Sequence, residues 1–273
     1  MHKMYHLIDE NEDFLVVDKQ PEVSIHDEDN AVDISDVNNK GLIKQLRLDF
    51  NNSAIAPVHR LDKPTSGLLI CSKHSQAASV LSQAFQNRQV EKYYLAISEI
   101  KPSKKQGLIS GDMLRTRNGS WKLSNAQTYP AVTQFFSYSL ANINNSRGRL
   151  FILKPHTGKS HQLRVALKTI DASILGDRRY GKIKKAVGDS SLNIKSSNIN
   201  NDVNIGVDQI DRMHLHAYVL RFYYKDKPYS YSVLPKGGAF TDELNDYINA
   251  SLNEPWALKW PAVSKKNKAI LSK

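Results

Sequence analysis

The sequence predicts a mixed fold in which β-strands and amphipathic helices build one large domain or two intimately packed subdomains. Two short apolar runs, 68–71 and 149–153, are typical of buried strands, and the alternating, aromatic-rich run 90–97 indicates a third. Apolar residues at helical spacing over 77–85 predict an amphipathic helix. The chain has 273 residues, which is enough to bury a sizeable core.

The most informative segment is a charged loop that leads directly into the strand at 68–71. Its sequence is His59-Arg60-Leu61-Asp62-Lys63-Pro64-Thr65-Ser66-Gly67. Pro64 removes a backbone donor and disfavours a helix at Lys63, and Gly67 can adopt backbone angles that other residues avoid. The strand that follows can hold Asp62 rigidly. A solvated turn with ordinary charges is the simple alternative, and two later segments weigh against it.

The first of these segments is a strand, turn and helix over 149–170. Arg149 to Leu153 is predicted as the strand, 155–158 as a turn, and Ser160 as the N-cap of a helix that runs to about Ile170. The spacing gives this helix an apolar face and a basic face. The apolar face comprises Leu163, Leu167 and Ile170, and the basic one His161, Arg164 and Lys168. A basic first turn suits a phosphate or a carboxylate, although ordinary surface helices also carry basic faces.

Gly158-Lys159-Ser160, between strand and helix, looks like the end of a nucleotide-binding P-loop. That motif needs a glycine five residues earlier, where this chain has Leu153, and Pro155 stiffens the turn. The sequence therefore disfavours a nucleoside triphosphate site.

The second segment is the strand 90–97, which contains Tyr93 and Tyr94. Neighbouring strand residues point to opposite faces, so one tyrosine is expected in the core and the other toward a cleft or solvent. The glycine-punctuated stretch that follows is predicted to be an exposed hairpin that could contact RNA phosphates. Its basic residues are Lys101, Lys104, Lys105, Arg115, Arg117 and Lys122.

Charge is unevenly distributed along the chain. The formal net charge is +11, yet residues 1–36 hold eleven acidic side chains against Lys3 and Lys19, so the remainder carries about +20. A body this basic favours a polyanion as partner, and RNA is the obvious candidate. Good solubility is the alternative explanation for the charge.

Cysteine content and hydropathy exclude several classes of protein. Cys71 is the only cysteine, which excludes an intrachain disulfide and a cysteine-cluster zinc site, and it is expected to be a packed thiol. No stretch is apolar enough to be a signal sequence or a membrane span, so we expect a cytoplasmic protein without membrane contact. The polar stretch 182–210 is predicted to be a flexible insertion, and 261–273 a loose basic tail.

Taken together, these motifs resemble the RluA-type pseudouridine synthases over about 7–234. The loop at 59–68 matches the family's catalytic loop almost letter for letter, and its order of charges has no general structural reason to recur. The other matching segments are 10–19, 92–96, 157–165, 176–181 and 212–217. Four positions depart from the family pattern, namely Gln20, Lys159, Ser160 and Ala166. Family members often carry an RNA-binding domain ahead of this core, which we do not expect here.

The resemblance implies an α+β fold with a bent, largely antiparallel mixed sheet flanked by helices around a basic central cleft. It implies that Asp62 is the catalytic aspartate, that Arg164 is its charge partner, and that Tyr94 stacks on the target base. RNA contacts are expected from the loop and from the basic helix. The residues concerned are Arg60, His59, Lys159, His161, Gln162 and Lys168.

Chemical reasoning agrees with these roles. Uridine isomerisation needs a carboxylate that acts as a nucleophile or base, a guanidinium that keeps it charged, and an aromatic platform for the base. It needs no metal and no cofactor, and none is expected. We therefore predict a single domain, 1–273, that isomerises uridine in a structured ribosomal or transfer RNA, as a monomer. The alternatives are a catalytically inactive RNA-binding protein with the same fold, and a carboxylate-dependent hydrolase, for which no second acid pairs with Asp62.

Overall fold

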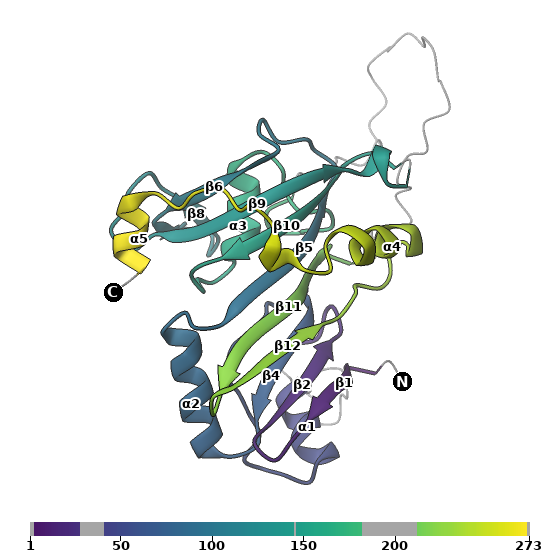
Figure 1. Cartoon of the computed structure of the whole chain (residues 1–273), viewed down its shortest axis with the longest axis vertical. Helices are drawn as coiled ribbons and strands as arrows, with labels where there is room; N and C mark the ends of the chain where they lie inside the picture. The colour runs from purple at the N-terminus through teal and green to yellow at the C-terminus, as the bar shows by residue number, and fades with distance from the viewer. Residues whose placement is uncertain (1–2, 28–40, 145, 182–211, 272–273) are drawn as a thin grey trace.

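The computed structural model describes residues 3–27, 41–144, 146–181 and 212–271, and these share one long, bent sheet (Figure 1). Its strand order is β1-β2-β4-β11-β5-β10-β9-β6, with β3 paired to β4 and β12 paired to β11. Among the described strands only the β4–β11 pairing is parallel. The predicted α+β fold with a largely antiparallel mixed sheet is therefore confirmed. The predicted insertion at 182–210 lies outside the described residues.

The first half of the chain supplies one wing of the sheet, the central strand β5 and the strand β6 at the opposite edge. The strands are β1 (Tyr5–Glu10), β2 (Phe14–Lys19), β3 (Ala56–Pro57), β4 (Ser66–Ser72), β5 (Glu91–Ser98) and β6 (Gln106–Gly111). Helix α1 (Leu42–Asp49) covers one face and α2 (Ser75–Gln86) the other. The predicted helix at 77–85 is confirmed as part of α2, where the His74 side chain accepts from the N–H of Ala77.

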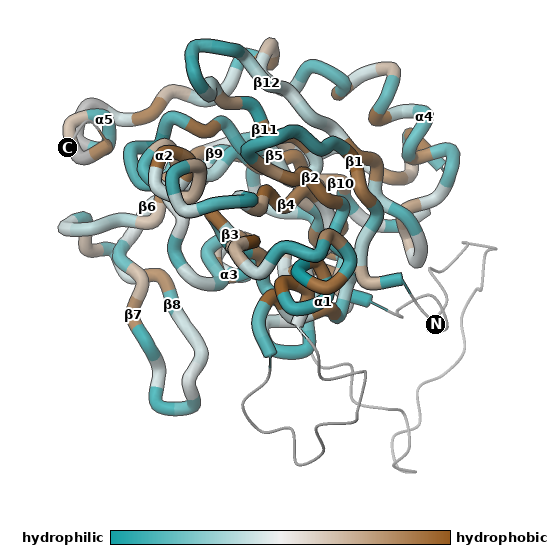
Figure 2. The backbone as a smooth tube through the Cα atoms, turned by 90° about the horizontal axis from the view of Figure 1, so that it is seen from below, coloured by the Kyte–Doolittle hydropathy of each residue, from teal (hydrophilic) through white to brown (hydrophobic). Residues whose placement is uncertain are grey.

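The second half completes the sheet. Its elements are β7 (Met113–Arg115), β8 (Trp121–Leu123), β9 (Ala131–Ser139), β10 (Arg149–Pro155), α3 (Gln162–Thr169), β11 (Leu215–Tyr224), β12 (Lys227–Ser232), α4 (Asp242–Ser251) and α5 (Lys265–Leu271). The predicted hairpin is the separate β7–β8 pair, which projects from the body in Figure 2.

Strand β5 shows why both faces of the sheet must be covered. Tyr93, Leu95 and Ile97 point into a cluster that includes α4, whereas Tyr94 and Ala96 point into the cluster beneath α1 and α3. This two-residue period confirms that the tyrosines lie on opposite faces. The central strands accordingly form the hydrophobic middle of the molecule in Figure 2. The buried Cys71 belongs to this core, and burial raises the pKa of its thiol to about 12.

The prediction of a loose tail at 261–273 is wrong for the part that the structure describes. The carbonyl of Pro261 accepts from the Gln134 side chain, and α5 follows at Lys265. Asn267 is buried against Ser110, while Arg88 donates to the carbonyl of Leu271 at 2.6 Å. Lysine-rich composition indicated a solvated tail, but backbone and amide groups in this segment form hydrogen bonds with β6, β9 and the residue Arg88 that follows α2.

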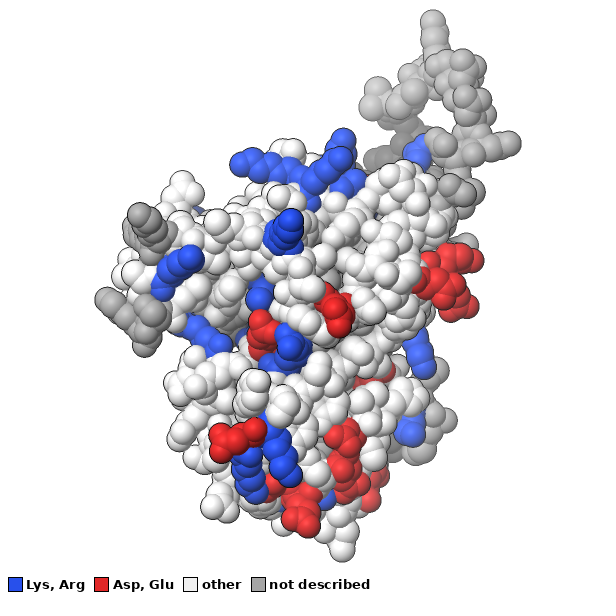
Figure 3. Space-filling model, in the orientation of Figure 1, with Lys and Arg blue, Asp and Glu red and all other residues white. Residues whose placement is uncertain are grey.

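No helix among the described residues is long and apolar enough to span a membrane. Lys and Arg predominate over the upper half of the face shown in Figure 3, whereas Asp and Glu lie mainly in its lower half and near α4.

Candidate active site

The charged loop 59–65 connects β3 to β4 and is pinned at both ends. Thr65 donates its N–H to the carbonyl of Asp62 at 2.9 Å, which closes a tight turn around Pro64. Gly67, the second residue of β4, has a φ of +107°, and a Cβ atom there would lie 2.3 Å from the carbonyl oxygen of Ala217. Glycine is therefore required where β4 meets β11, immediately after the loop. This contact fixes the point at which the loop that carries Asp62 joins the sheet.

Lys19, the last residue of β2, anchors the same loop from below. Its fully buried ammonium donates to the carbonyls of Gln20, Val23 and Lys63 at 2.9, 2.8 and 3.0 Å. Burial, together with the charge of Arg212, lowers the pKa of Lys19 to about 7, against the opposite influence of nearby acidic groups. Sequence reasoning assigned no role to this lysine.

Ser66, the first residue of β4 after the loop, belongs to a buried chain of hydrogen bonds. Its hydroxyl accepts from Arg212 and lies 2.8 Å from Nδ1 of His216, whose Nε2 lies 2.8 Å from the carbonyl of Val233. A carbonyl only accepts, so this network assigns the proton to Nε2 and makes Ser66 the donor to Nδ1. Burial lowers the pKa of His216 to about 3, so the ring is neutral.

Asp62 and Arg164 lie in contact although 102 residues separate them in the chain. Arg164 lies in the first turn of α3, and its Nη1 is 3.2 Å from Oδ2 of Asp62. The side chain of Asp62 is 14% exposed and that of Arg164 is 7% exposed. Among the described residues only Oδ2 of Asp62 accepts a hydrogen bond, and Oδ1 has no donor.

Asp177 holds Arg164 from the other side, and sequence reasoning missed this role. Its two carboxylate oxygens accept from Nε and Nη2 of Arg164, both at 2.8 Å, and its side chain is fully buried. Oδ1 also accepts from the N–H groups of Arg179 and Tyr180. The motif 176–181 was noted as a family signature, which was the available signal, but its partner could not be deduced from spacing.

Asp62, Arg164 and Asp177 form a triad in which each charge stabilises its neighbour. Burial raises the pKa of the Asp177 carboxyl, but the hydrogen bonds and charge of Arg164 outweigh it, so the pKa lies below its ordinary value. Burial likewise lowers the pKa of Arg164, yet Asp177 and then Asp62 raise it above its ordinary value. A buried ion pair of this geometry keeps both partners ionised.

Tyr94 lines the same cavity from β5, on the face opposite to Tyr93. Burial raises the pKa of its hydroxyl, and the negative charge of Asp62 raises it further. The phenol is therefore neutral at physiological pH and offers a ring face and a polar hydroxyl next to the carboxylate.

Tyr180 gathers the predicted basic residues of α3 around one ring. His161 Nδ1 lies 2.8 Å from its hydroxyl, while Arg164 and the exposed Lys168 lie over the ring at 5.0 and 5.6 Å. The hydroxyl also accepts from the N–H of Trp121 in β8 at 3.0 Å, which ties the projecting hairpin to the site. The predicted basic face of the helix is confirmed, but Lys168 lies outside the cavity.

One prediction about the start of α3 is wrong, and a second is disfavoured. Ser160 is not the N-cap, because the chain makes a turn through 159–161 and His161 takes that position with a φ of +56°. Gln162 lines the cavity, but its buried amide makes four internal hydrogen bonds, which leave it little capacity for the predicted RNA contact. It donates to Val132 and Thr133 and accepts from Thr157 and Lys159. Gln162 therefore fixes the loop 155–161 to β9.

The remaining predicted RNA contacts differ in accessibility. His59 lines the cavity but stacks on Phe85 at 4.4 Å, and its Nε2 accepts from the N–H of Ile70 at 3.0 Å. Burial and the charge of Lys92 lower the pKa of His59 to about 3, so a charged contact with RNA is not available to it. Arg60 and Lys159 are exposed at the cavity wall, where contact with RNA remains our prediction.

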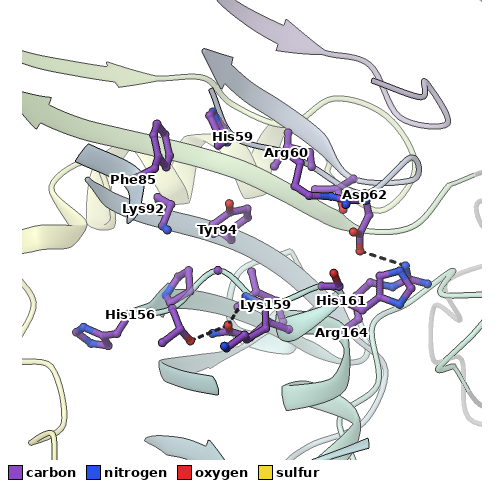
Figure 4. A pocket seen from close by; sticks show the side chains of 18 of the residues that line it. His59, Arg60, Asp62, Phe85, Lys92, Tyr94, His156, Lys159, His161 and Arg164 are labelled. Carbon is purple, nitrogen blue, oxygen red and sulfur yellow. Dashed lines mark hydrogen bonds and ion pairs between the residues drawn. The ribbon is translucent and has the colours of Figure 1, made fainter. Parts of the chain in front are cut away.

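The cavity that joins these residues has a volume of about 500 Å³ (Figure 4). Asp62, Arg164 and His161 lie at one end of it, and Lys92 and His156 lie at the other. Neither Lys92 nor His156 was singled out from the sequence. Among the described residues, no group of His, Cys, Asp or Glu side chains could hold a metal ion.

A family model described as RNA pseudouridylate synthase matches residues 13–169, which include Asp62, Tyr94 and Arg164. The chain belongs to this family. An uncharacterized RNA pseudouridine synthase of Haemophilus influenzae is 38% identical over 252 residues, which cover 92% of this chain and 97% of that protein. The resemblance to RluA-type pseudouridine synthases is thereby confirmed, and the protein is an isomerase.

Other relatives match a shorter region. Ribosomal large subunit pseudouridine synthase D of Borreliella burgdorferi is 36% identical over 165 residues, which cover 59% of this chain and 49% of that protein. The solved structure of human RNA Pseudouridylate Synthase Domain Containing 1 is 22% identical with a TM-score of 0.65, and the match covers 94% of this chain and 97% of that one. That likeness shows a shared pseudouridine synthase fold.

Proposed function

We propose that this pseudouridine synthase acts on a defined uridine in a structured ribosomal or transfer RNA, with Asp62 as the reacting group and without a cofactor. The observation that carries the proposal is the Asp62–Arg164 pair. Its two members, 3.2 Å apart, lie inside a cavity whose wall includes Tyr94. A carboxylate with one oxygen held by a buried guanidinium and the other free is a poised nucleophile or base.

The reaction exchanges one bond of ribose for another. The bond from C1′ to N1 of uracil breaks, the base turns, and a bond from C1′ to C5 forms, while C5 loses a proton and N1 gains one. No atom is added and no electron is transferred overall, so the chain's own side chains suffice. Asp62 would attack the nucleoside or remove the C5 proton, and Arg164 would stabilise the carboxylate when the bound base excludes water.

Tyr94 is suited to hold the base during this turn. Its phenol is neutral and lies on the cavity wall beside Asp62. Stacking on an aromatic ring contributes about 1–3 kcal/mol per base and tolerates rotation of the base within the stacking plane. That energy helps to offset the few kcal/mol needed to extract a base from an RNA helix.

The RNA substrate follows from charge and from the relatives. The body after residue 36 carries a net charge of about +20, which favours a polyanion. The curated relatives include proteins named as a ribosomal large subunit pseudouridine synthase and a tRNA pseudouridine synthase. Both kinds of RNA present structured loops from which a uridine can be extracted.

The decisive experiment is a map of pseudouridines across total RNA from cells with and without this gene. We expect one or a few uridines to lose modification in the deletion strain and to regain it when the wild-type gene is returned. An identical map in both strains would contradict the proposed activity.

The purified protein should then release tritium from RNA labelled at C5 of uracil. Activity should be unchanged after dialysis against EDTA, because Asp62 and Arg164 need no metal. A loss of activity that added metal ions restore would contradict the cofactor-free part of the proposal alone.

A further inference from the structure

The active-site cavity extends well past the catalytic pair. In Figure 4, Asp62 and Arg164 occupy one end, and Tyr94 lies between them and a second group of side chains. The residues labelled at this far end are Phe85, Lys92 and His156. With a volume of about 500 Å³ the cavity is larger than one uracil ring requires, so the far end is available to another part of the substrate.

Lys92 is the basic group at this far end. It lies on the same face of β5 as Tyr94, two residues away, and its ammonium is 5.7 Å from the centroid of the Phe85 ring. Among the described residues it has no carboxylate within 4.0 Å and no hydrogen-bond acceptor. Burial lowers the pKa of Lys92 to about 8, which still leaves most of it charged at neutral pH. Lys92 is half-buried, and a cation that is partly removed from water without a counter-ion is unfavourable for the free protein.

Lys154 on the neighbouring strand β10 shows how a lysine in this sheet is usually neutralised, by a carboxylate of the same chain. Its ammonium lies 3.1 Å from Oε1 of Glu91 and 5.1 Å from the Tyr93 ring. It therefore has the carboxylate that Lys92 lacks, on the other face of the sheet. The contrast indicates that the partner of Lys92 is supplied from outside the chain.

The neighbours of Lys92 favour an anion over a second base. Phe85 is already engaged by the stacked ring of His59 and by the ammonium of Lys92. His156 lies 2.7 Å from the Gln134 carbonyl oxygen, and burial, with the charges of Lys154 and Lys92, lowers its pKa to about 4. The ring is neutral and its Nε2–H is used, so Lys92 supplies the positive charge at this end.

We propose that Lys92 binds a phosphate group of the RNA backbone adjacent to the target uridine. Residues two apart on a strand are separated by about 7 Å, which is comparable to the distance between a base and a flanking phosphate of the same chain. A base stacked on Tyr94 therefore brings its own backbone to Lys92. This inference rests on the proposed function for the position of the base, and it adds an anchor that fixes the register of the RNA.

The first test needs no knowledge of the natural RNA. Uridine, uridine 3′-monophosphate and uridine 5′-monophosphate are titrated by NMR into the full-length wild-type protein. At least one monophosphate should bind about tenfold more tightly than uridine, as expected for a charge-assisted hydrogen bond. Whichever monophosphate gains affinity identifies the side of the uridine on which the phosphate lies.

Two variants make this test specific. Lys92→Met removes the charge and keeps the length of the side chain, and it should abolish the gain from phosphate. Lys154→Met removes one positive charge from the opposite face of the sheet and should keep the gain. Equal binding of the three compounds to wild type, or a gain that persists in Lys92→Met, would overturn the proposal.

Thermal unfolding separates a ligand-binding lysine from a structural one. Because Lys92 has no counter-ion in the free protein, Lys92→Met should unfold at the same or a higher temperature than wild type. A lower unfolding temperature combined with an intact gain from phosphate would show that Lys92 is structural.

A second test uses RNA and keeps the two proposals distinguishable. A stem-loop around the mapped uridine is synthesised with a normal or an uncharged methylphosphonate linkage on each side. In wild type one neutral linkage should weaken binding about tenfold, and in Lys92→Met it should have no further effect. If wild type converts this uridine but the two changes act independently, the phosphate site is wrong and the isomerase assignment stands. If the gain in nucleotide affinity depends on Lys92 while no RNA is converted, the phosphate site stands and the proposed function is wrong.

Discussion

Arg164 is bound more closely by Asp177 than by Asp62. Two hydrogen bonds of 2.8 Å join its guanidinium to Asp177, and one of 3.2 Å joins it to Asp62. The planar fork of arginine makes this possible, because one edge can be fixed while a further N–H points elsewhere. Asp177 thus positions Arg164, and Arg164 in turn presents one N–H to the carboxylate proposed to react. The consequences of mutation therefore differ at each member of the triad.

Asp62→Asn should abolish isomerisation without unfolding the protein. Arg164 keeps its two bonds to Asp177, so no buried charge loses its last partner. We expect tritium release from C5-labelled RNA to fall to background, while RNA affinity and unfolding temperature stay near those of wild type. Substantial release by the folded variant would sink the assignment of Asp62.

Arg164→Leu should destabilise the fold as well as stop turnover. It leaves Asp177 fully buried without its cation, which typically costs about 3–5 kcal/mol. Adding Asp177→Asn removes the orphaned charge, so the double variant should regain much of the lost stability in urea unfolding but none of the activity. Wild-type stability of the single variant would show that the buried pair does not exist in solution.

The lowered pKa of Asp177 predicts a specific acid sensitivity. Because the folded-state pKa lies below the ordinary carboxyl value of about 3.9, the ionised form stabilises the fold fully above that value. This contribution is lost as the pH falls through the lower folded-state pKa. The difference in unfolding free energy between wild type and Asp177→Asn should therefore be largest near neutral pH and shrink in the acid range. A difference independent of pH would contradict this.

Gln162→Ala should affect stability and leave RNA affinity alone. The substitution leaves three buried polar groups, on Val132, Thr133 and Thr157, and the partly buried N–H of Lys159 without the amide that now satisfies them. Each unsatisfied group costs about 1–3 kcal/mol unless water replaces the amide. Urea unfolding measures the loss, and RNA binding below the unfolding transition provides the control. A large loss of affinity in a stable variant would restore the original prediction of an RNA contact.

The exposed cations near the hairpin should account for part of the salt dependence of RNA binding. They are Lys104, Lys105, Arg115 and Arg117. Neutralising all four should reduce the magnitude of the slope of log affinity against log salt concentration by up to about 3. The choice of uridine should survive, because phosphate contacts position an RNA without specifying its bases. An unchanged slope would place the RNA instead along His161, Lys168 and the Arg178–Arg179 pair.

Motifs were informative where function demands an unusual order of residues within one segment. The loop around Asp62, followed by an apolar strand, indicated both a rigid turn and a carboxylate fixed to the core. The alternation of Tyr93 and Tyr94 likewise indicated which side chains would face opposite ways. Helical spacing placed Arg164 and Lys168 on one face of α3, and Tyr180 packs there.

Only the tertiary structure decided which of these groups are in contact and which form hydrogen bonds within the protein. Asp177 and Lys19 reach the site through contacts across many residues, and such pairing leaves no local period in a sequence. Gln162 looked like a polar residue on a basic helix, but burial turned its amide into an internal link. Burial and hydrogen-bond satisfaction depend on everything that packs around a side chain, so they are properties of the tertiary structure alone. The residue types were written in the sequence, and their surroundings were not.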